Sequence, residues 1–143
     1  MCVKQVSVIL DNVPGKFLSV SECLARENIN IRAISVADTS STSTVRFVTD
    51  NPQKTISVLR SNGYNVLEND VIAVEIPDHP GALRAVLKPL KEYNINVLYF
   101  YTYLGRGESG QPIVIIGVDR TQDALEALKK NWVHTFGNEI YAL

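Results

Sequence analysis

Short runs of alternating hydrophobic and polar residues predict strands, and segments with helical spacing separate them. Residues 4–11 (KQVSVILD) and 71–78 (VIAVEIPD) are apolar-rich and run into polar turns, as strands do. Behind each turn, apolar residues recur every three or four positions, which predicts a helix with one apolar side. These helical positions are Phe17, Val20 and Leu24, and then Leu83, Val86 and Leu90.

The whole pattern occurs twice along the 143 residues. Pro14-Gly15 aligns with Pro80-Gly81 at an offset of 66, and residues 28–31 (NINI) then fall on 94–97 (NINV). The second copy gains three residues between its second and third strands, where 105–111 replaces 38–43, and the offset becomes 69. The period is too long for a solenoid unit, so the chain is a duplication.

The hydrophobic pattern of each copy predicts the element order β-α-β-β-α-β, which is that of the ferredoxin-like fold. We therefore expect an α+β fold of two such repeats, each an antiparallel sheet with both helices on one face. Residues 1–69 form the first repeat and 70–143 the second, joined at 68–70 (END). The remaining strands are expected at 29–38, 43–50 and 64–68, and at 95–104, 112–119 and 133–143; the second helices are expected at 52–63 and from Thr121. Pro89 interrupts a helix and predicts a kink there.

The repeated turn places a short polar side chain before Pro-Gly and a helix after it. The first N–H groups of a helix have no partner inside it and carry partial positive charge, which suits a carboxylate. Glycine allows a ligand to approach the backbone closely. A purely structural alternative is that Asn12 and Asp78 cap the helices, as Asn and Asp often do.

The turn motif resembles the ACT domain family. Asn12-Val13-Pro14-Gly15 with Asn30-Ile31, and Asp78-His79-Pro80-Gly81 with Asn96-Val97, match its pattern of polar turn, Pro-Gly, helix and Asn-Ile. The resemblance covers nearly the whole chain. It implies that paired domains bind a small ligand, most often an amino acid, at their interface, and regulate a metabolic enzyme or transcription.

The resemblance also implies where the ligand binds. The turn of one repeat and the early second strand of the other form each pocket: Asn12 with Asn96, and Asp78 with Asn30. The expected ligand-binding residues are Asn12, Val13, Gly15, Lys16, Asn30, Asp78, His79, Gly81, Ala82 and Asn96. Many amino-acid-binding members carry asparagine where this chain has Asp78, so the two sites are expected to differ.

Tyr99, Tyr101 and Tyr103 alternate and therefore share one face of a strand. The other face, with Leu98 and Phe100, is expected under the helices, which leaves the tyrosines on the open face. Sheet aromatics support a rival hypothesis, an RNA-recognition module with the same element order. The third strands lack the basic-glycine-aromatic signature of that module, and the net charge of −1 does not attract nucleic acid.

Other functional classes find less support. Cys2, Cys23, His79 and His134 have no metal-ligand spacing, and no nucleophile is paired with a base, so we expect no metal, cofactor or catalytic residue. A small ferredoxin-like enzyme, such as an acyl-phosphate hydrolase, would need an arginine in the turn, and neither Pro-Gly turn contains one. No apolar run reaches the roughly 20 residues that span a bilayer, and residues 1–11 do not form a signal peptide.

Together with its resemblance to the ACT domain family, the sequence therefore predicts a non-catalytic cytoplasmic regulatory protein that binds a free amino acid. Its expected partners are that ligand, a second copy in a homodimer, and a metabolic enzyme that it regulates, with no nucleic acid and no membrane.

Overall fold

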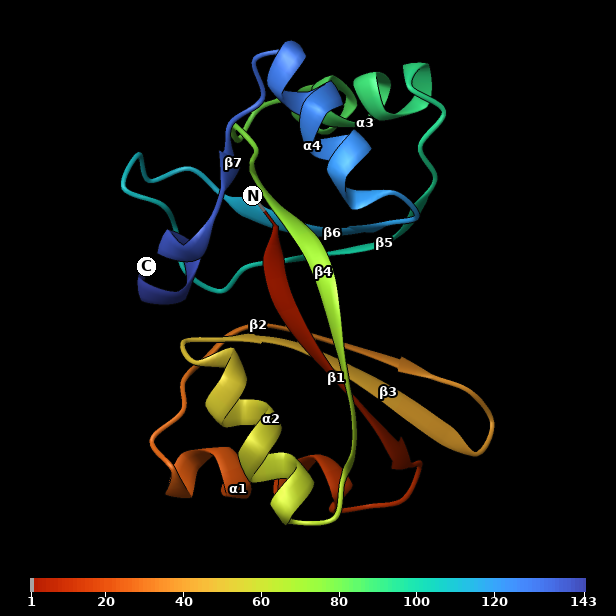
Figure 1. Cartoon of the computed structure of the whole chain (residues 1–143), viewed down its shortest axis with the longest axis vertical. Coiled ribbons are helices and arrows are strands. Elements are labelled where there is room, and N and C mark those ends of the chain that lie inside the picture. The colour runs from red at the N-terminus through yellow and green to blue at the C-terminus, as the bar shows by residue number, and fades with distance from the viewer. Residues whose placement is uncertain (1) are drawn as a thin grey trace. The chain divides into compact units, whose positions relative to one another are not determined.

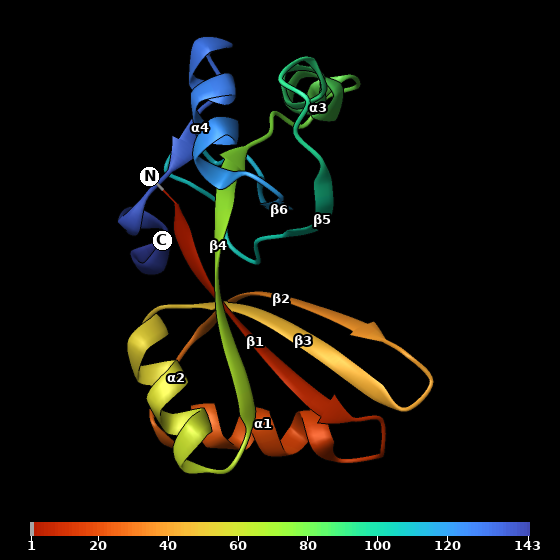
Figure 2. The same ribbon diagram turned by 45° about the vertical axis from the view of Figure 1, so that its right-hand side comes forward.

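The computed structural model describes residues 2–143 and divides them into two compact units (Figure 1). Lys4–Asn69 form the first unit, and Asp70–Leu143 together with residues 2 and 3 form the second. Each unit is an antiparallel sheet with two helices on one face (Figure 2). The predicted fold class, α+β with two ferredoxin-like repeats, is confirmed.

The first unit has its strands in the order β2-β3-β1-β4. Its core lies between the helices and strands β1 and β3, where Val8, Leu24, Phe47 and Leu59 are buried together. The elements are β1 (Val3–Asp11), α1 (Lys16–Arg26), β2 (Ile31–Asp38), β3 (Thr42–Thr49), α2 (Pro52–Ser61) and the first half of β4 (Asn65–Glu75).

The second unit has its strands in the order β5-β6-β4-β7. Its core joins Ile72, Leu90, Ile116 and Leu128 from the sheet and both helices. The elements are the second half of β4, α3 (Ala82–Glu92), β5 (Val97–Thr102), β6 (Ile113–Val118), α4 (Thr121–Lys130), β7 (Thr135–Phe136) and the 3₁₀ helix η1 (Asn138–Ala142).

Two predicted boundaries differ in the structure. Residues 68–70, expected as a joint, lie inside β4, which runs unbroken from Asn65 to Glu75 and supplies a strand to each unit. The predicted last strand at 133–143 is short, because only Thr135–Phe136 pair with β4 and the chain then forms η1.

The ends of all four helices use a left-handed residue. Asn28, Gly63, Asn94 and Trp132 have φ between 56° and 81° and follow α1, α2, α3 and α4. At the C-terminal end of α3, the Ile95 N–H donates to the Leu90 carbonyl at 2.8 Å, and the Asn94 N–H donates to the Lys91 carbonyl at 3.0 Å. This is a Schellman motif, and it gives the first asparagine of each NIN sequence a structural reason.

The edge strands β2 and β5 are less covered than the sequence predicted. Phe100 pairs with Ile116 of the core, so it lies on the helix face as expected, yet it is 51% exposed. The helices pack on β1, β3, β4 and β6, and they leave the apolar residues of the two edge strands in contact with solvent. Phe17 and Leu83, predicted to face the sheet from the first helices, are also exposed.

The expectation that the tyrosines lie on an open face is wrong. Tyr101 and Tyr103 are buried, and the Tyr103 hydroxyl donates to the Ile140 carbonyl at 3.0 Å. The C-terminal segment thus holds Tyr103, and Tyr99 lies against Gly117. The stripe offers no exposed aromatic platform for RNA bases, which removes the main support for that alternative.

The left-handed asparagine generates a prediction about stability. Asn94→Ala should lower the free energy of unfolding by about 1 kcal/mol, because alanine tolerates φ of 56° poorly, whereas Asn94→Gly should cost nothing. Urea denaturation measures both. Asn96→Ala, two residues away, is the control and should change stability by less than about 0.5 kcal/mol; equal losses for Asn94→Ala and Asn96→Ala would contradict the assignment.

Candidate ligand-binding site

The first turn lies between β1 and α1, and its backbone is fixed by hydrogen bonds. The Asn12 N–H donates to the Ser41 carbonyl at 3.0 Å, and the Val13 N–H to Asp11 at 2.9 Å. Gly15 has φ of 87° and immediately precedes the helix. A left-handed residue at this point favours glycine, which explains the glycine of the motif.

The helix N-terminus beside Gly15 is open to solvent. The N–H groups of Lys16, Phe17 and Leu18 have no acceptor within residues 2–143, as expected for a first helical turn. No side chain caps α1, so the capping alternative for Asn12 is wrong. The Asn12 carboxamide is exposed and makes no hydrogen bond to the described part of the chain, and neither does the Lys16 ammonium.

The second turn, between β4 and α3, has the same backbone but a different support. Gly81 has φ of 84°, and again no side chain caps the helix, so Asp78 is not a cap either. The Asp78 N–H donates to the side-chain oxygen of Gln111 at 3.3 Å, where the first turn uses a backbone carbonyl. The three-residue insertion therefore changes how the second turn is held.

The residues around Gly81 are also less available than those around Gly15. The Ala82 N–H donates to the His79 carbonyl at 3.3 Å, and Ala82 is buried, so this N–H is not free for a ligand. The His79 ring contacts the Pro80 carbonyl at 2.9 Å through Nδ1. Ala82 stands where the first turn has Lys16, so the second turn has a carboxylate at Asp78 and lacks the matching cation.

Asn30 and Asn96 each lie one residue before a second strand and are held in the same way. The Asn30 N–H donates to the Asp50 carboxylate at 3.1 Å and the Asn30 carbonyl accepts from the Asp50 N–H at 3.0 Å. The Asn96 N–H likewise donates to the Asp119 carboxylate at 3.1 Å, and the Asn96 carbonyl accepts from the Asp119 N–H at 3.2 Å. The alignment of Asp50 with Asp119 in the sequence is the signal from which this clamp could have been inferred.

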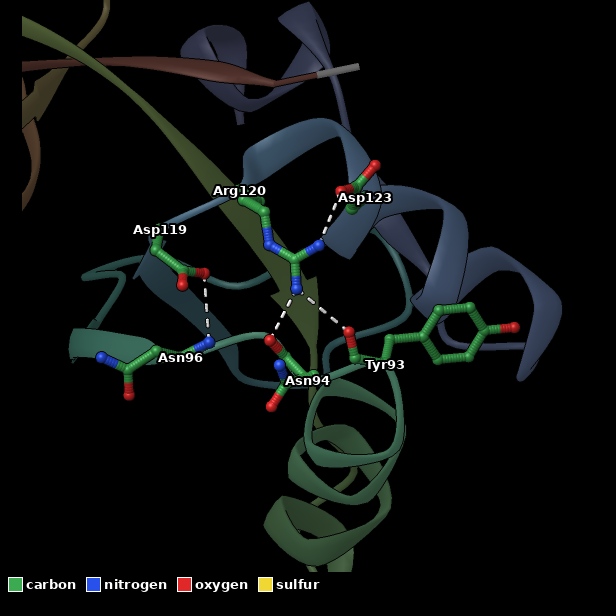
Figure 3. Close-up of polar contacts among 6 residues, drawn as sticks. All are labelled: Tyr93, Asn94, Asn96, Asp119, Arg120 and Asp123. Atoms are coloured by element: carbon green, nitrogen blue, oxygen red, sulfur yellow. Dashed lines mark hydrogen bonds and ion pairs between the residues drawn. The ribbon is translucent and has the colours of Figure 1, made fainter.

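Figure 3 shows the Asn96 side chain directed away from these contacts. Neither Asn30 nor Asn96 has a side-chain hydrogen bond among the residues that the structure describes, and both are exposed. The backbone clamp thus fixes where the carboxamide is attached and leaves its donor and acceptor groups to an incoming molecule.

Next to Asp119 in the chain, the guanidinium of Arg120 contacts the carbonyls at the C-terminal end of α3. Arg120 donates to the carbonyls of Tyr93 and Asn94 at 3.1 and 2.6 Å and pairs with Asp123 at 3.0 Å (Figure 3). In the first repeat the Lys54 ammonium donates to the Glu27 carbonyl at 2.8 Å. Different residues therefore satisfy the negative end of the helix dipole at the same place.

Within one repeat, the turn and the strand asparagine do not come together. The turn precedes the first helix and the asparagine follows its end, and helices α1 and α3 each have eleven residues. At 1.5 Å per residue the two groups are separated by about 16 Å. A small ligand that uses both kinds of residue must therefore contact two repeats.

The structure adds a polar cluster that sequence reasoning missed. Ser109 Oγ donates to Glu75 at 2.5 Å, and His134 Nδ1 lies 3.4 Å from the other Glu75 oxygen. The carboxylate stands between serine and histidine, so the ring cannot take the serine proton and the trio is not a nucleophile with its base. No sequence pattern links residues 75, 109 and 134, since only the fold brings them together.

This cluster lines a cavity of about 390 Å³ in the second repeat. Backbone N–H groups of Gly137 and Glu139 hold the pKa of the Glu139 carboxyl below its usual value, and His134 acts in the same direction. No group of His, Cys, Asp and Glu in residues 2–143 could hold a metal ion. No helix in that range is both long and apolar enough to cross a membrane.

Comparisons with known proteins agree with this architecture. The ACT domain pair family matches residues 1–140. The chain is similar in structure to protein BT0572 from Bacteroides thetaiotaomicron, with a TM-score of 0.91, 30% identity, and 100% and 98% of the two chains covered. No curated protein matches the sequence.

More distant similarities concern the fold alone. The regulatory subunit of aspartate kinase from Thermus thermophilus, in its ligand-free form, gives a TM-score of 0.63 at 17% identity over 90% of this chain and 92% of that one. The corresponding subunit from Thermus flavus gives 0.59 at 16% identity with the same coverage. On the family match over residues 1–140 and the repeated fold, the chain belongs to the ACT domain pair family.

Proposed function

We propose that this protein is a non-catalytic regulator that binds a free amino acid between ACT repeats. The observation that supports the proposal most directly is the first turn, where Asn12 is exposed and its side chain, the Lys16 ammonium and three N–H groups have no hydrogen-bond partner in residues 2–143. Membership of the ACT domain pair family points in the same direction, toward ligand-sensing regulation.

The chemistry of the first turn fits the α-carboxylate of an amino acid. The N–H groups after Gly15 present partial positive charge, and the Asn12 amide can donate a further hydrogen bond. The Lys16 ammonium adds a full charge nearby. The ligand's ammonium group then needs an acceptor, which the carboxamide oxygen of Asn96, from a different repeat, can supply.

The second turn is proposed to bind the same class of ligand more weakly. An ionised Asp78 cannot donate a hydrogen bond, and its charge repels a carboxylate nearby. It can accept from the ligand's ammonium, with Asn30 of a different repeat beside it. Since the Ala82 N–H is engaged with His79, fewer donors remain for the carboxylate.

The side chain of the ligand at the first turn is proposed to be apolar. A hollow of about 260 Å³ opens beside α1, starting at Phe17 in its first turn, and Ile34 and Val36 of β2 line its other side. A separate hollow beside α3 is lined by Arg84, Lys88 and Lys91 together with Leu83 and Leu87. An apolar amino acid therefore matches the first repeat better than a polar one.

The regulatory output is proposed to pass to another protein. We propose that the chain acts as a homodimer, because the edge strands β2 and β5 leave apolar side chains and unpaired backbone groups exposed. A metabolic enzyme is the proposed target of the ligand signal.

A thermal-shift screen of the twenty amino acids tests the central proposal. A specific ligand at a hundredfold excess over its dissociation constant stabilises the folded chain by about 2.7 kcal/mol, which raises the melting temperature measurably. Stabilisation by leucine, isoleucine, valine, methionine or phenylalanine is expected. If no amino acid raises the melting temperature, amino-acid binding is wrong.

Calorimetry with the amino acid identified by the screen tests the residues. Asn12→Ala and Asn96→Ala should each weaken the tighter site by roughly 1.5–3 kcal/mol, the range for a hydrogen bond to a charged group. Asn12→Ala should leave stability within about 0.5 kcal/mol, because Asn12 caps no helix. Asn30→Ala is the matched control and should leave the tighter site unchanged; equal effects of Asn30→Ala and Asn96→Ala would reject the proposed pairing.

The second turn yields a gain-of-function prediction. Asp78→Asn should strengthen binding at the weaker site about tenfold or more, because the amide can donate and carries no negative charge. Calorimetry would then resolve a second binding event. Glu92→Gln, which raises the net charge by the same one unit at the exposed last residue of α3, controls for net charge, and an equal effect of both substitutions would contradict a direct role of Asp78.

A further inference from the structure

Trp132 is the single tryptophan of the chain and stands in an unusual place. It follows α4, has φ of 62°, and is 95% exposed. The equivalent residue in the first repeat is Gly63, at φ of 81°, and asparagine ends the other two helices. Glycine and asparagine adopt this conformation readily, whereas a bulky residue is strained in it.

Within residues 2–143 the indole has no contact that would offset this strain. Its surface is almost fully in contact with solvent, so its large apolar area is unburied. An observed backbone outlier of this kind is a reason to look for a function. Exposed tryptophan is also the residue type most enriched among binding hot spots.

The surface around Trp132 combines a hollow with unpaired charges of both signs. The hollow has a volume of about 850 Å³. Glu126 and Lys129 are among its lining residues, both are exposed, and neither has an ion pair within the described residues. The Lys130 ammonium lies 5.8 Å from the centre of the Tyr93 ring. Val133, His134 and Thr135 complete the lining.

We propose that this surface, called the Trp132 patch and made of residues 126, 129, 130 and 132–135, is a contact between two copies of the chain. An isologous contact must be self-complementary in shape and charge, because the same patch faces itself. Here one patch carries both an exposed indole and a shallow, open hollow that the indole helps to line. A twofold axis places each indole in the partner's hollow and each Lys129 opposite the partner's Glu126.

The occupant is a second copy rather than another protein because the patch supplies both halves of each interaction. An acidic partner would leave Glu126 facing like charge, and a basic partner would do the same to Lys129. The arrangement also has the anatomy of an interface, with an aromatic centre and a polar rim. The contact rests on the homodimer proposed above, places its interface at the Trp132 patch and not at the edge strands β2 and β5, and does not depend on ligand binding.

The single tryptophan reports directly on the contact. In a dilution series of the purified full-length protein, acrylamide quenching of tryptophan fluorescence should fall as protein concentration rises, in step with the mass from analytical ultracentrifugation. Trp132→Gly should weaken self-association at least tenfold and raise the melting temperature at low protein concentration, because it removes strain. A destabilising substitution would not produce that pair of effects.

Charge exchange provides the matched test. Lys129→Glu and Glu126→Lys should each weaken association, and the double exchange should restore it, since the opposite charges face each other again. Lys91→Glu, in the last turn of α3, makes the same charge change elsewhere and should have no effect.

The proposal is overturned if acrylamide quenches Trp132 fully at every protein concentration. It is also overturned if Trp132→Gly leaves the mass measured by ultracentrifugation unchanged. A third contrary result would be that Lys129→Glu weakens self-association no more than Lys91→Glu does. A dimer with an accessible Trp132 would overturn this contact and leave the proposed amino-acid regulator intact. Conversely, a Trp132-dependent dimer that binds no amino acid would support the contact and reject the ligand.

Discussion

Strand β4 is the constraint on which both sheets depend. β4 lies beside β1 at the end of the first sheet; in the second sheet its residues 72–75 pair with β6, and Ala73 and Val74 also pair with β7. The difference in position explains the composition of the strand. At the end of a sheet, exposed polar residues such as Glu68 and Asn69 are tolerated, whereas Ala73 and Val74, which pair with a strand on each side, are fully buried.

The two turns show which positions the fold fixes and which it leaves free. Gly15 and Gly81 have nearly the same left-handed φ, and Asn28 and Asn94 have the same one, so backbone geometry has been kept in both repeats. Asn12 and Asp78 are exposed and cap no helix. A side chain that the fold does not use can differ without loss of stability, and this is where the two proposed sites diverge in charge.

Coverage of the sheets is uneven, and this leaves the surfaces that a partner or ligand can use. The helices bury the middle strands, but β2 and β5 keep apolar residues such as Val36 and Phe100 about half exposed. On the other face of β5, the C-terminal segment covers Tyr103 through two backbone carbonyls. Trp132, at the end of α4, is exposed for a different reason: no described part of the chain packs over it.

The sequence by itself determined the duplication, the β-α-β-β-α-β order, the helix starts after Gly15 and Gly81, and the face of β5 on which Phe100 lies. These features follow from local periodicity and from backbone conformations that glycine favours, and both are encoded in neighbouring residues. The clamps from Asp50 and Asp119, the Gln111 contact to the second turn and the Glu75–Ser109–His134 cluster join residues more than fifteen positions apart. Only the tertiary structure decided them, and only it decided which residues stay exposed, because burial depends on which elements pack over a strand and not on the strand's own pattern.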